Sequence, residues 1–227
     1  GIGIVLDGVF SHTGSDSRYF NREGRYGEGG AYRDPNSPYR SWYDFDSKYK
    51  GGYRSWWGFE TLPEVNEETP SYVEFITGEG GVIDTWLRRG AAGFRLDVAD
   101  ELPDEFIEKV RTAVKRVGPD KFLLGEVWED ATTKFGFDKR RTYLLGKGLD
   151  SVMNYPFKNA VLGFVCGRDA GQTMTDILSI CEHYPAPALD TALNFLSTHD
   201  TERALTVIAD EPANGRGREW QSGRCVT

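Results

Sequence analysis

The sequence predicts an α/β protein, a partial (β/α)8 TIM barrel with an irregular small domain inserted after the first strand present. Short apolar runs alternate with helical patterns, which is typical of βαβ units and a parallel sheet. Acids or histidines end four of these runs, as catalytic residues do in a barrel, whereas an open doubly wound sheet gathers them at one switch point. About five strands are recognisable, and a closed barrel of this type needs about eight. We therefore expect the 227 residues to cover part of a barrel.

The first predicted strand opens the chain. Residues 2–6 are aliphatic and β-branched, as expected of a strand that is buried on both faces of a parallel sheet. Asp7 and His12 follow directly, so residues 1–12 combine a barrel strand with a first site motif. Because the chain starts inside this strand and without a methionine, we expect further residues upstream.

Residues 13–69 have a different texture, rich in Gly, Ser, Asn, Pro and aromatic residues, with no helical or strand period. Irregular segments longer than about 15 residues in compact domains are usually functional or disordered. Disordered segments are poor in aromatics, so we expect an ordered small domain that overhangs a site. Its aromatic residues include Tyr39, Trp42, Tyr43, Tyr49, Tyr53, Trp56 and Trp57.

Residues 70–210 carry the remaining predicted βα units, and residues 211–227, which hold no recognisable strand, are interpreted as the truncated end of the barrel. Apolar stripes with a helical period and short apolar runs define these elements. The predicted helices are 70–90, with an interruption at 78–81, then 104–117, a pair broken at 167–171, and 201–210; the predicted strands are 91–97, 121–127, 150–155 and 192–197.

The composition excludes several classes of function. A net charge of -8 disfavours nucleic acid and an anionic membrane surface as partners. No apolar run approaches the roughly 20 residues that cross a bilayer. The three cysteines are widely spaced, so neither a disulfide framework nor a thiolate zinc site is indicated. The compartment, cytoplasmic or secreted, stays open.

Three acids, Asp97, Glu126 and Asp200, end separate predicted strands and are expected to meet at one mouth. Arg95 precedes Asp97 by two residues and shares its strand face, where its charge favours an ionised, nucleophilic carboxylate. In one interpretation, two of the acids flank a glycosidic bond as the nucleophile and the proton donor of a retaining glycoside hydrolase. The third acid then orients the substrate.

A second interpretation assigns the acids, with His12 and His199, to a divalent metal that activates water, as in a metal-dependent TIM-barrel hydrolase. The histidines are far apart in the sequence, which disfavours this alternative. A single acid at a strand end is more often a helix cap or a surface group than a catalyst, but four such strand ends together favour catalysis. Trp128 shares a strand face with Glu126 and is expected in the cleft.

Five motifs, in order, resemble the characteristic regions of the α-amylase family of glycoside hydrolases. Within that family, residues 98–101 after Asp97 and Trp128 after Glu126 are most similar to the neopullulanase and cyclomaltodextrinase branch. The five motifs are residues 7–12, 62–66, 93–97, 125–128 and 195–200.

The resemblance implies a retaining double displacement at α-glucosidic bonds in starch-derived oligosaccharides, cyclodextrins or pullulan, with an α-glucan oligosaccharide as the partner. Asp97 is the implied nucleophile, Glu126 the acid and then the base, and Asp200 the stabiliser of the transition state. Asp7 is implied to support the site residues without binding the substrate itself. The implied substrate-binding residues are His12, Arg95, Trp128, His199 and Arg203.

On this resemblance the chain covers about strands three to seven, and residues 13–69 are the small domain that follows the third strand. Ser11 stands where many members carry a calcium-binding asparagine, and a hydroxyl is a poorer ligand, so neither calcium nor any other cofactor is predicted. Asp100 and Glu101 stand where many amylases carry a Lys-His pair, which leaves the preference for α-1,4 or α-1,6 bonds open.

A third interpretation is a non-catalytic relative that binds glucan or a partner protein. Degenerate relatives usually lose the catalytic acids, and this chain keeps all three. For the isolated 227 residues we expect no activity, because an unclosed barrel exposes strand edges and part of its core. Assembly into a homo-oligomer is left open.

Overall fold

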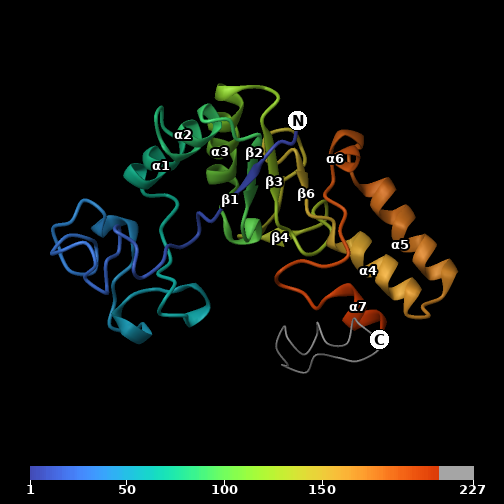
Figure 1. The fold of residues 1–227 in the computed structure, drawn as a ribbon, viewed down its shortest axis with the longest axis horizontal. Helices are drawn as coiled ribbons and strands as arrows, with labels where there is room; N and C mark the ends of the chain where they lie inside the picture. The colour runs from blue at the N-terminus through green and yellow to red at the C-terminus, as the bar shows by residue number, and fades with distance from the viewer. Residues whose placement is uncertain (210–227) are drawn as a thin grey trace.

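Four parallel strands form the centre of the protein (Figure 1). They are β1 (Val5–Gly8), β2 (Gly93–Leu96), β3 (Phe122–Gly125) and β6 (Ser151–Val152), and they pair in the order β1-β2-β3-β6. The structure is a computed structural model, and it describes residues 1–209. The predicted tail 211–227 and the end of the predicted helix 201–210 therefore lie outside the described residues.

The register of the sheet brings the strand ends to one level. Leu96 pairs with Gly125 in the parallel ladder, so Asp97 and Glu126 leave adjacent strands side by side. The β2–β3 pairing requires glycine at position 93, because a Cβ atom there would lie 2.1 Å from the carbonyl oxygen of Phe122. The geometry of the sheet thus decides where the two acids emerge.

Helices α1 to α3 pack against the sheet, and helices α4 to α7 lie beyond its β6 edge. On one face pack α1 (Pro70–Thr77), α2 (Val82–Arg88) and α3 (Asp104–Val117), and the apolar stripe of α3 is buried. Beyond β6 lie α4 (Tyr155–Val165), α5 (Ala170–His183), α6 (Ala186–Asp190) and α7 (Ala204–Ile208), with α4 packed on α5 and on α7 (Figure 1).

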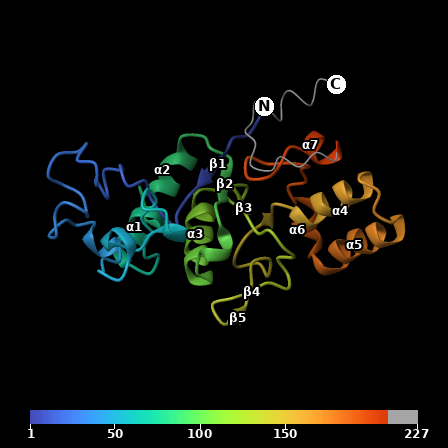
Figure 2. The same ribbon diagram turned by 90° about the horizontal axis from the view of Figure 1, so that it is seen from below.

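Residues 13–69 form an irregular lobe on the opposite side of the sheet from α4 and α5 (Figures 1 and 2). Its regular structure consists of three short 3-10 helices, η1 (Arg40–Trp42), η2 (Lys50–Gly52) and η3 (Trp56–Gly58). Packed rings replace sheet and helix as its core, since Phe20 is fully buried with its ring 4.6 Å from that of Tyr53 and 4.8 Å from that of Tyr43. The lobe is ordered, as its aromatic content predicts.

Most of the predicted elements are confirmed, with shorter strands. The helix 104–117 has the predicted bounds, the helix 70–90 is interrupted where expected, and the helical pair breaks between α4 and α5. The strand at 150–155 ends early because Tyr155 begins α4. A small hairpin, β4 (Phe135–Gly136) with β5 (Lys139–Arg140), lies in a segment where no strand is predicted.

Two strand predictions are wrong. The first strand is not buried on both faces, because β1 is the edge of the sheet and leaves Val5 42% exposed. The predicted strand 192–197 is reduced to one isolated parallel bridge between Met153 and Leu193. Both differences arise at the two margins of the sheet, where apolar residues lack a second neighbouring strand. Within residues 1–209, none of the helices combines the length and apolar character needed to cross a membrane.

Candidate active site

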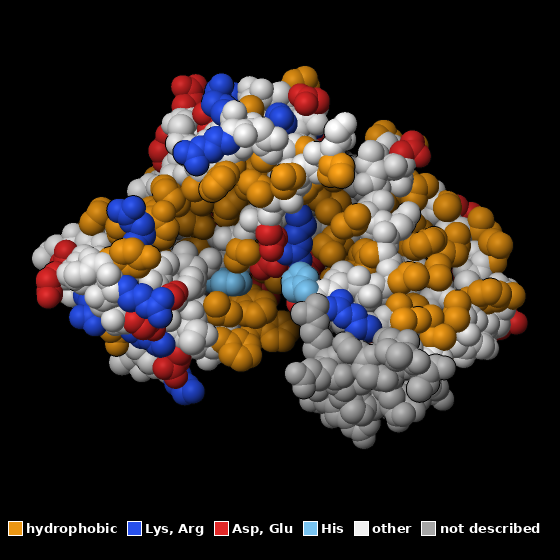
Figure 3. Space-filling model, viewed as in Figure 1, with side chains coloured by type: hydrophobic (Ala, Val, Ile, Leu, Met, Phe, Trp, Pro, Cys, Tyr) orange, Lys and Arg blue, Asp and Glu red, His pale blue; other side chains and the backbone are white. Residues whose placement is uncertain are grey.

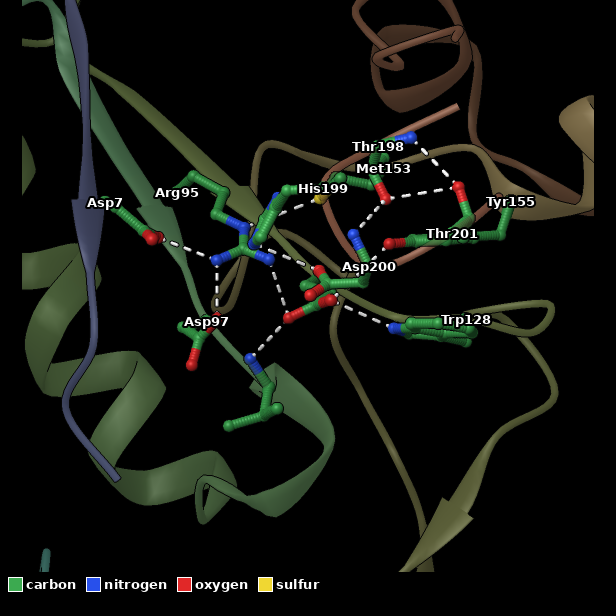
Figure 4. A network of polar contacts seen from close by, with 12 residues as sticks. Asp7, Arg95, Asp97, Trp128, Met153, Tyr155, Thr198, His199, Asp200 and Thr201 are labelled. Atoms are coloured by element: carbon green, nitrogen blue, oxygen red, sulfur yellow. Dashed lines mark hydrogen bonds and ion pairs between the residues drawn. The ribbon is translucent and has the colours of Figure 1, made fainter. Parts of the chain in front are cut away.

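Arg95, on β2, is the centre of the site (Figure 4). Its Nη1 donates to Oδ1 of Asp7 at 2.7 Å and to Oδ1 of Asp97 at 2.6 Å. Its Nη2 lies 2.7 Å from Oε2 of Glu126, an ion pair without hydrogen-bond geometry. Nε points to the sulfur of Met153 at 3.5 Å. The pairing of β1, β2 and β3 therefore brings three acids to one guanidinium.

Glu126 is the most enclosed of these acids, with a side chain that is 4% exposed. Its Oε2 accepts a hydrogen bond from the backbone N–H of Val98 at 2.8 Å, and its Oε1 accepts one from Nε1 of Trp128 at 2.9 Å. Val98 adopts a left-handed conformation, with φ 38° and ψ 51°. That conformation is strained for a β-branched residue. The strained backbone at Val98 thus supplies the N–H donor that holds the Glu126 carboxyl group in place.

Burial raises the pKa of Asp97 above its ordinary value, while the hydrogen bond and charge of Arg95 oppose this rise, and the charges of Glu126 and Asp7 reinforce it. The predicted contact between Arg95 and Asp97 is confirmed. The prediction that Arg95 controls the ionisation of Asp97 is wrong, because the pKa of Asp97 is raised and not lowered. Removing the carboxylate from water outweighs the attraction of the guanidinium, because that one cation is shared among three acids.

His12 is half-buried beside the same acids. Burial lowers its pKa, and the charges of Asp97 and Glu101 oppose this shift. Its Nδ1 lies 2.9 Å from Oγ of Ser11, and its ring centroid lies 5.2 Å from that of Trp56. The neutral imidazole is therefore favoured, and it is positioned between the sheet and the lobe.

Ser11, at the position compared above with a calcium-binding asparagine, contacts its neighbour in the chain. Its side chain is buried, and its hydroxyl contacts His12. Across the described part of the chain, no group of three His, Cys, Asp or Glu side chains is arranged to hold a metal ion.

Asp200 and its neighbours reach the site from a loop. The Asp200 N–H donates to Oγ1 of Thr198 at 3.2 Å, and Nε2 of His199 lies 3.1 Å from Oδ2 of Asp200. The side chains of His199 and Asp200 are 69% and 39% exposed. Arg203 donates from Nη1 to the carbonyl oxygen of Thr198 at 3.3 Å, so it braces the loop.

A cavity of about 550 Å³, which we call the site cavity, joins Asp97, Glu126 and Asp200. Figure 3 shows acidic side chains in a hollow between the lobe and the helices beyond β6, with histidine side chains beside them. Among the predicted site residues, Trp128 lines the cavity with these acids, whereas His12, Arg95, His199 and Arg203 are not in its lining. The other lining residues are Trp56, Trp57, Val98, Asp100, Glu101, Glu129 and Lys134.

The sequence interpretation missed several of these residues as parts of the site. The adjacent pair Trp56 and Trp57 was a usable signal within the aromatic lobe. Lys134 gave none, because its position depends on the path of an irregular segment between β3 and β6. Tyr155, whose ring stacks on that of Trp128 at 4.5 Å, was expected inside a strand.

The family model for the α-amylase catalytic domain matches residues 1–221. The chain belongs to the α-amylase family. It is 36% identical over 245 residues to an amylopullulanase of Thermoanaerobacterium saccharolyticum, covering 94% of this chain and 18% of that protein. It is 34% identical over 215 residues to a cyclomaltodextrinase of a Bacillus species, covering 91% of this chain and 35% of that protein. The chain thus spans well under half the length of these relatives.

Solved structures of other proteins have a similar fold. The ligand-bound cyclic α-maltosyl-(1→6)-maltose hydrolase of Arthrobacter globiformis superposes with a TM-score of 0.79 at 28% identity, over 92% of this chain and 45% of that chain. A debranching enzyme of Nostoc punctiforme gives a TM-score of 0.75 at 29% identity, over 92% of this chain and 45% of that chain. The predicted partial TIM barrel and the resemblance to the neopullulanase and cyclomaltodextrinase branch are confirmed.

Proposed function

We propose that this protein is a retaining glycoside hydrolase that cleaves α-glucosidic bonds in starch-derived oligosaccharides, cyclodextrins or pullulan. The proposal depends on one observation above all: Asp97, Glu126 and Asp200 line a single cavity, with Arg95 beneath the first two. The names of the relatives, which include amylopullulanase, cyclomaltodextrinase and neopullulanase, support the choice of α-glucans.

In the proposed first step, Asp97 attacks the anomeric carbon and forms a glycosyl ester as the bond to the leaving oxygen breaks. Glu126 gives its proton to that oxygen. In the second step, Glu126 takes a proton from water, and the water oxygen displaces Asp97 from the anomeric carbon. Arg95 binds Oδ1 of Asp97, which leaves Oδ2 as the attacking atom.

The remaining residues position the sugar in this proposal. Asp200 stabilises the positive charge that develops on the sugar, and His12 and His199 donate to its hydroxyl groups. Trp128 binds the sugar from the cavity wall, and Arg203 supports substrate binding through its hydrogen bond to the Thr198 carbonyl oxygen. Asp7 acts through its ion pair with Arg95 and does not touch the sugar.

The direct test measures release of reducing sugar from maltohexaose and β-cyclodextrin by the protein in its full natural length. We expect Asp97→Asn and Glu126→Gln to lower the rate by about 10³-fold or more. The exposed residues Asp120 and Glu28 supply matched controls, and Asp120→Asn and Glu28→Gln should keep the wild-type rate. If the two cavity variants also keep it, the assigned roles are wrong.

Stereochemistry separates this proposal from a metal-dependent hydrolase. A double displacement retains configuration, so proton NMR should detect the α anomer as the first product. Initial formation of the β anomer would refute retention. A stoichiometric transition metal whose removal abolishes turnover would favour the metal-dependent alternative.

We also infer that residues 1–227 alone do not turn over substrate. Ile4, just before the edge strand β1, is 64% exposed, and Asp200 lies on a loop that follows the single strand bridge at Leu193. Exposed strand edges favour pairing between chains over a rigid site. Turnover by the purified monomeric chain of 227 residues would contradict this inference.

A further inference from the structure

Tyr155 is a buried residue at the edge of the site, and it is the first residue of α4. Its ring stacks on that of Trp128 with the centroids 4.5 Å apart, and it meets the ring of Phe195 edge-on at 4.8 Å. Packing against two rings fixes the orientation of a third. The hydroxyl group of Tyr155 therefore has a defined direction, and it points toward the acids of the site (Figure 4).

The Tyr155 hydroxyl group reaches one oxygen of Glu126. It donates to Oε1 at 3.5 Å, and Nε1 of Trp128 donates to the same oxygen at 2.9 Å. The other oxygen, Oε2, accepts from the N–H of Val98 and lies beside the guanidinium of Arg95. A neighbouring cation favours negative charge on Oε2. The proton of the Glu126 carboxyl group is therefore expected on Oε1, the oxygen that Tyr155 and Trp128 contact.

The same hydroxyl group also faces the loop that carries Asp200. Burial raises the pKa of Tyr155 to about 12, while a hydrogen bond with Thr198 opposes this rise, and the charges of Glu126 and Asp200 reinforce it. The phenol thus keeps its proton near neutral pH and stays a donor. Thr198 in turn accepts a hydrogen bond from the Asp200 N–H. One neutral group therefore links the Glu126 carboxyl group to the loop.

We propose that Tyr155 is a positioning residue, which holds Oε1 of Glu126 where this oxygen gives its proton to the leaving oxygen of the substrate. Its hydroxyl group contacts Oε1, and its ring supports Trp128, the second donor to Oε1. Hydrogen bonds that orient a catalytic group often shorten in the transition state, so the 3.5 Å contact can tighten as the proton moves. The inference rests on the proposed function, because it concerns the proton transfers of Glu126.

Two substrates separate proton transfer from the rest of the reaction in the full-length protein. Maltohexaose has a sugar leaving group that needs a proton, whereas fluoride leaves α-maltosyl fluoride without one. Tyr155→Phe keeps the ring and removes only the hydroxyl group. It should lower kcat/KM for maltohexaose by about tenfold and keep kcat/KM for α-maltosyl fluoride within about twofold of the wild-type value. This parameter covers the steps up to departure of the leaving group, before Glu126 acts as a base.

Tyr53 provides a matched control. Like Tyr155 it is 1% exposed, and its hydroxyl group donates to the carbonyl oxygen of Glu60 at 2.6 Å. Both residues belong to the lobe, and neither lines the site cavity. Tyr53→Phe should therefore leave kcat/KM for both substrates at the wild-type value.

A double variant tests whether Tyr155 acts through Glu126. Residues that act as one unit are not additive, so Tyr155→Phe added to Glu126→Gln should cause no further loss with maltohexaose. A residue that merely supports the fold would add its own loss to that of Glu126→Gln.

The outcomes separate the two proposals. If the wild-type protein hydrolyses neither substrate, the proposed glycosidase activity fails, and the role of Tyr155 fails with it. If the wild-type protein hydrolyses both, and Tyr155→Phe lowers both equally or lowers neither, the positioning role is wrong while the proposed activity stands. A further loss in the double variant would also refute the positioning role.

Discussion

The two halves of the site differ in how well the preceding strands are paired in the sheet. Asp97 and Glu126 follow strands that pair along their whole length, and their side chains are 19% and 4% exposed around Arg95. Asp200 and His199 follow a segment joined to the sheet by one bridge, and their side chains are 39% and 69% exposed. We call these the paired half and the open half. Strand pairing, more than residue type, therefore decides how firmly an acid of the site is held.

The largest effect is expected from breaking the paired half at Arg95. Arg95→Met leaves Glu126 buried beside Asp97 without its cation, and loss of one partner of a buried pair typically costs about 3 kcal/mol or more. Urea unfolding should show that loss, and activity should fall by about 10³-fold. Arg25→Met removes an exposed pair with Asp16 and should leave unfolding unchanged. Equal stability of both variants would refute a supporting role for Arg95.

The open half should separate activity from stability. Asp200→Asn removes the charge that stabilises the transition state in the proposed mechanism, so we expect kcat to fall by about 10²-fold or more. Because Asp200 is exposed and supports no strand, the free energy of unfolding of the Asp200→Asn protein should differ from that of the wild type by less than about 0.5 kcal/mol. Urea unfolding beside kcat on maltohexaose checks both, and a large loss of stability would remove the distinction between the halves.

His199 should give a smaller effect in the same half. Its Nε2 lies 3.1 Å from Oδ2 of Asp200, and its side chain is 69% exposed. His199→Asn keeps a donor but shortens the reach, and we expect kcat/KM to fall by about tenfold. A loss as large as that of Asp200→Asn would show that the loop acts as one rigid unit.

The smallest effect is a shift in the pH profile. Burial raises the pKa of Asp97 above 3.8, and the anion is the proposed nucleophile, so kcat/KM should decline on acidification at a higher pH than an ordinary aspartate would give. Arg95 opposes the rise, so Arg95→Lys, which loses the two-nitrogen fork, should move this limb to still higher pH. The dependence of kcat/KM on pH, measured with α-maltosyl fluoride, checks this shift. Movement of the acidic limb to lower pH in Arg95→Lys would show that Arg95 does not lower the pKa of Asp97.

The sequence predicted the paired half far better than the open half. The apolar runs before Asp97 and Glu126 form neighbouring strands, so residue alternation was enough to place Arg95, Asp97 and Trp128. The run before Asp200 has equal strand character, but its pairing stops after Leu193, and pairing depends on neighbours that one segment cannot specify. The contacts of Lys134 and the strain at Val98 arise from tertiary structure.

Trapping of a covalent intermediate tests directly whether Asp97, held in the paired half, is the nucleophile. A 5-fluoro-α-maltosyl fluoride should react with the full-length protein and accumulate a covalent glycosyl ester, because the fluorine slows its hydrolysis. Proteolysis and mass spectrometry should then locate the added maltosyl mass on the peptide that contains Asp97, and Asp97→Asn should abolish it. Labelling of a different carboxylate, or full turnover of maltohexaose by Asp97→Asn, would contradict the role of Asp97 as the nucleophile.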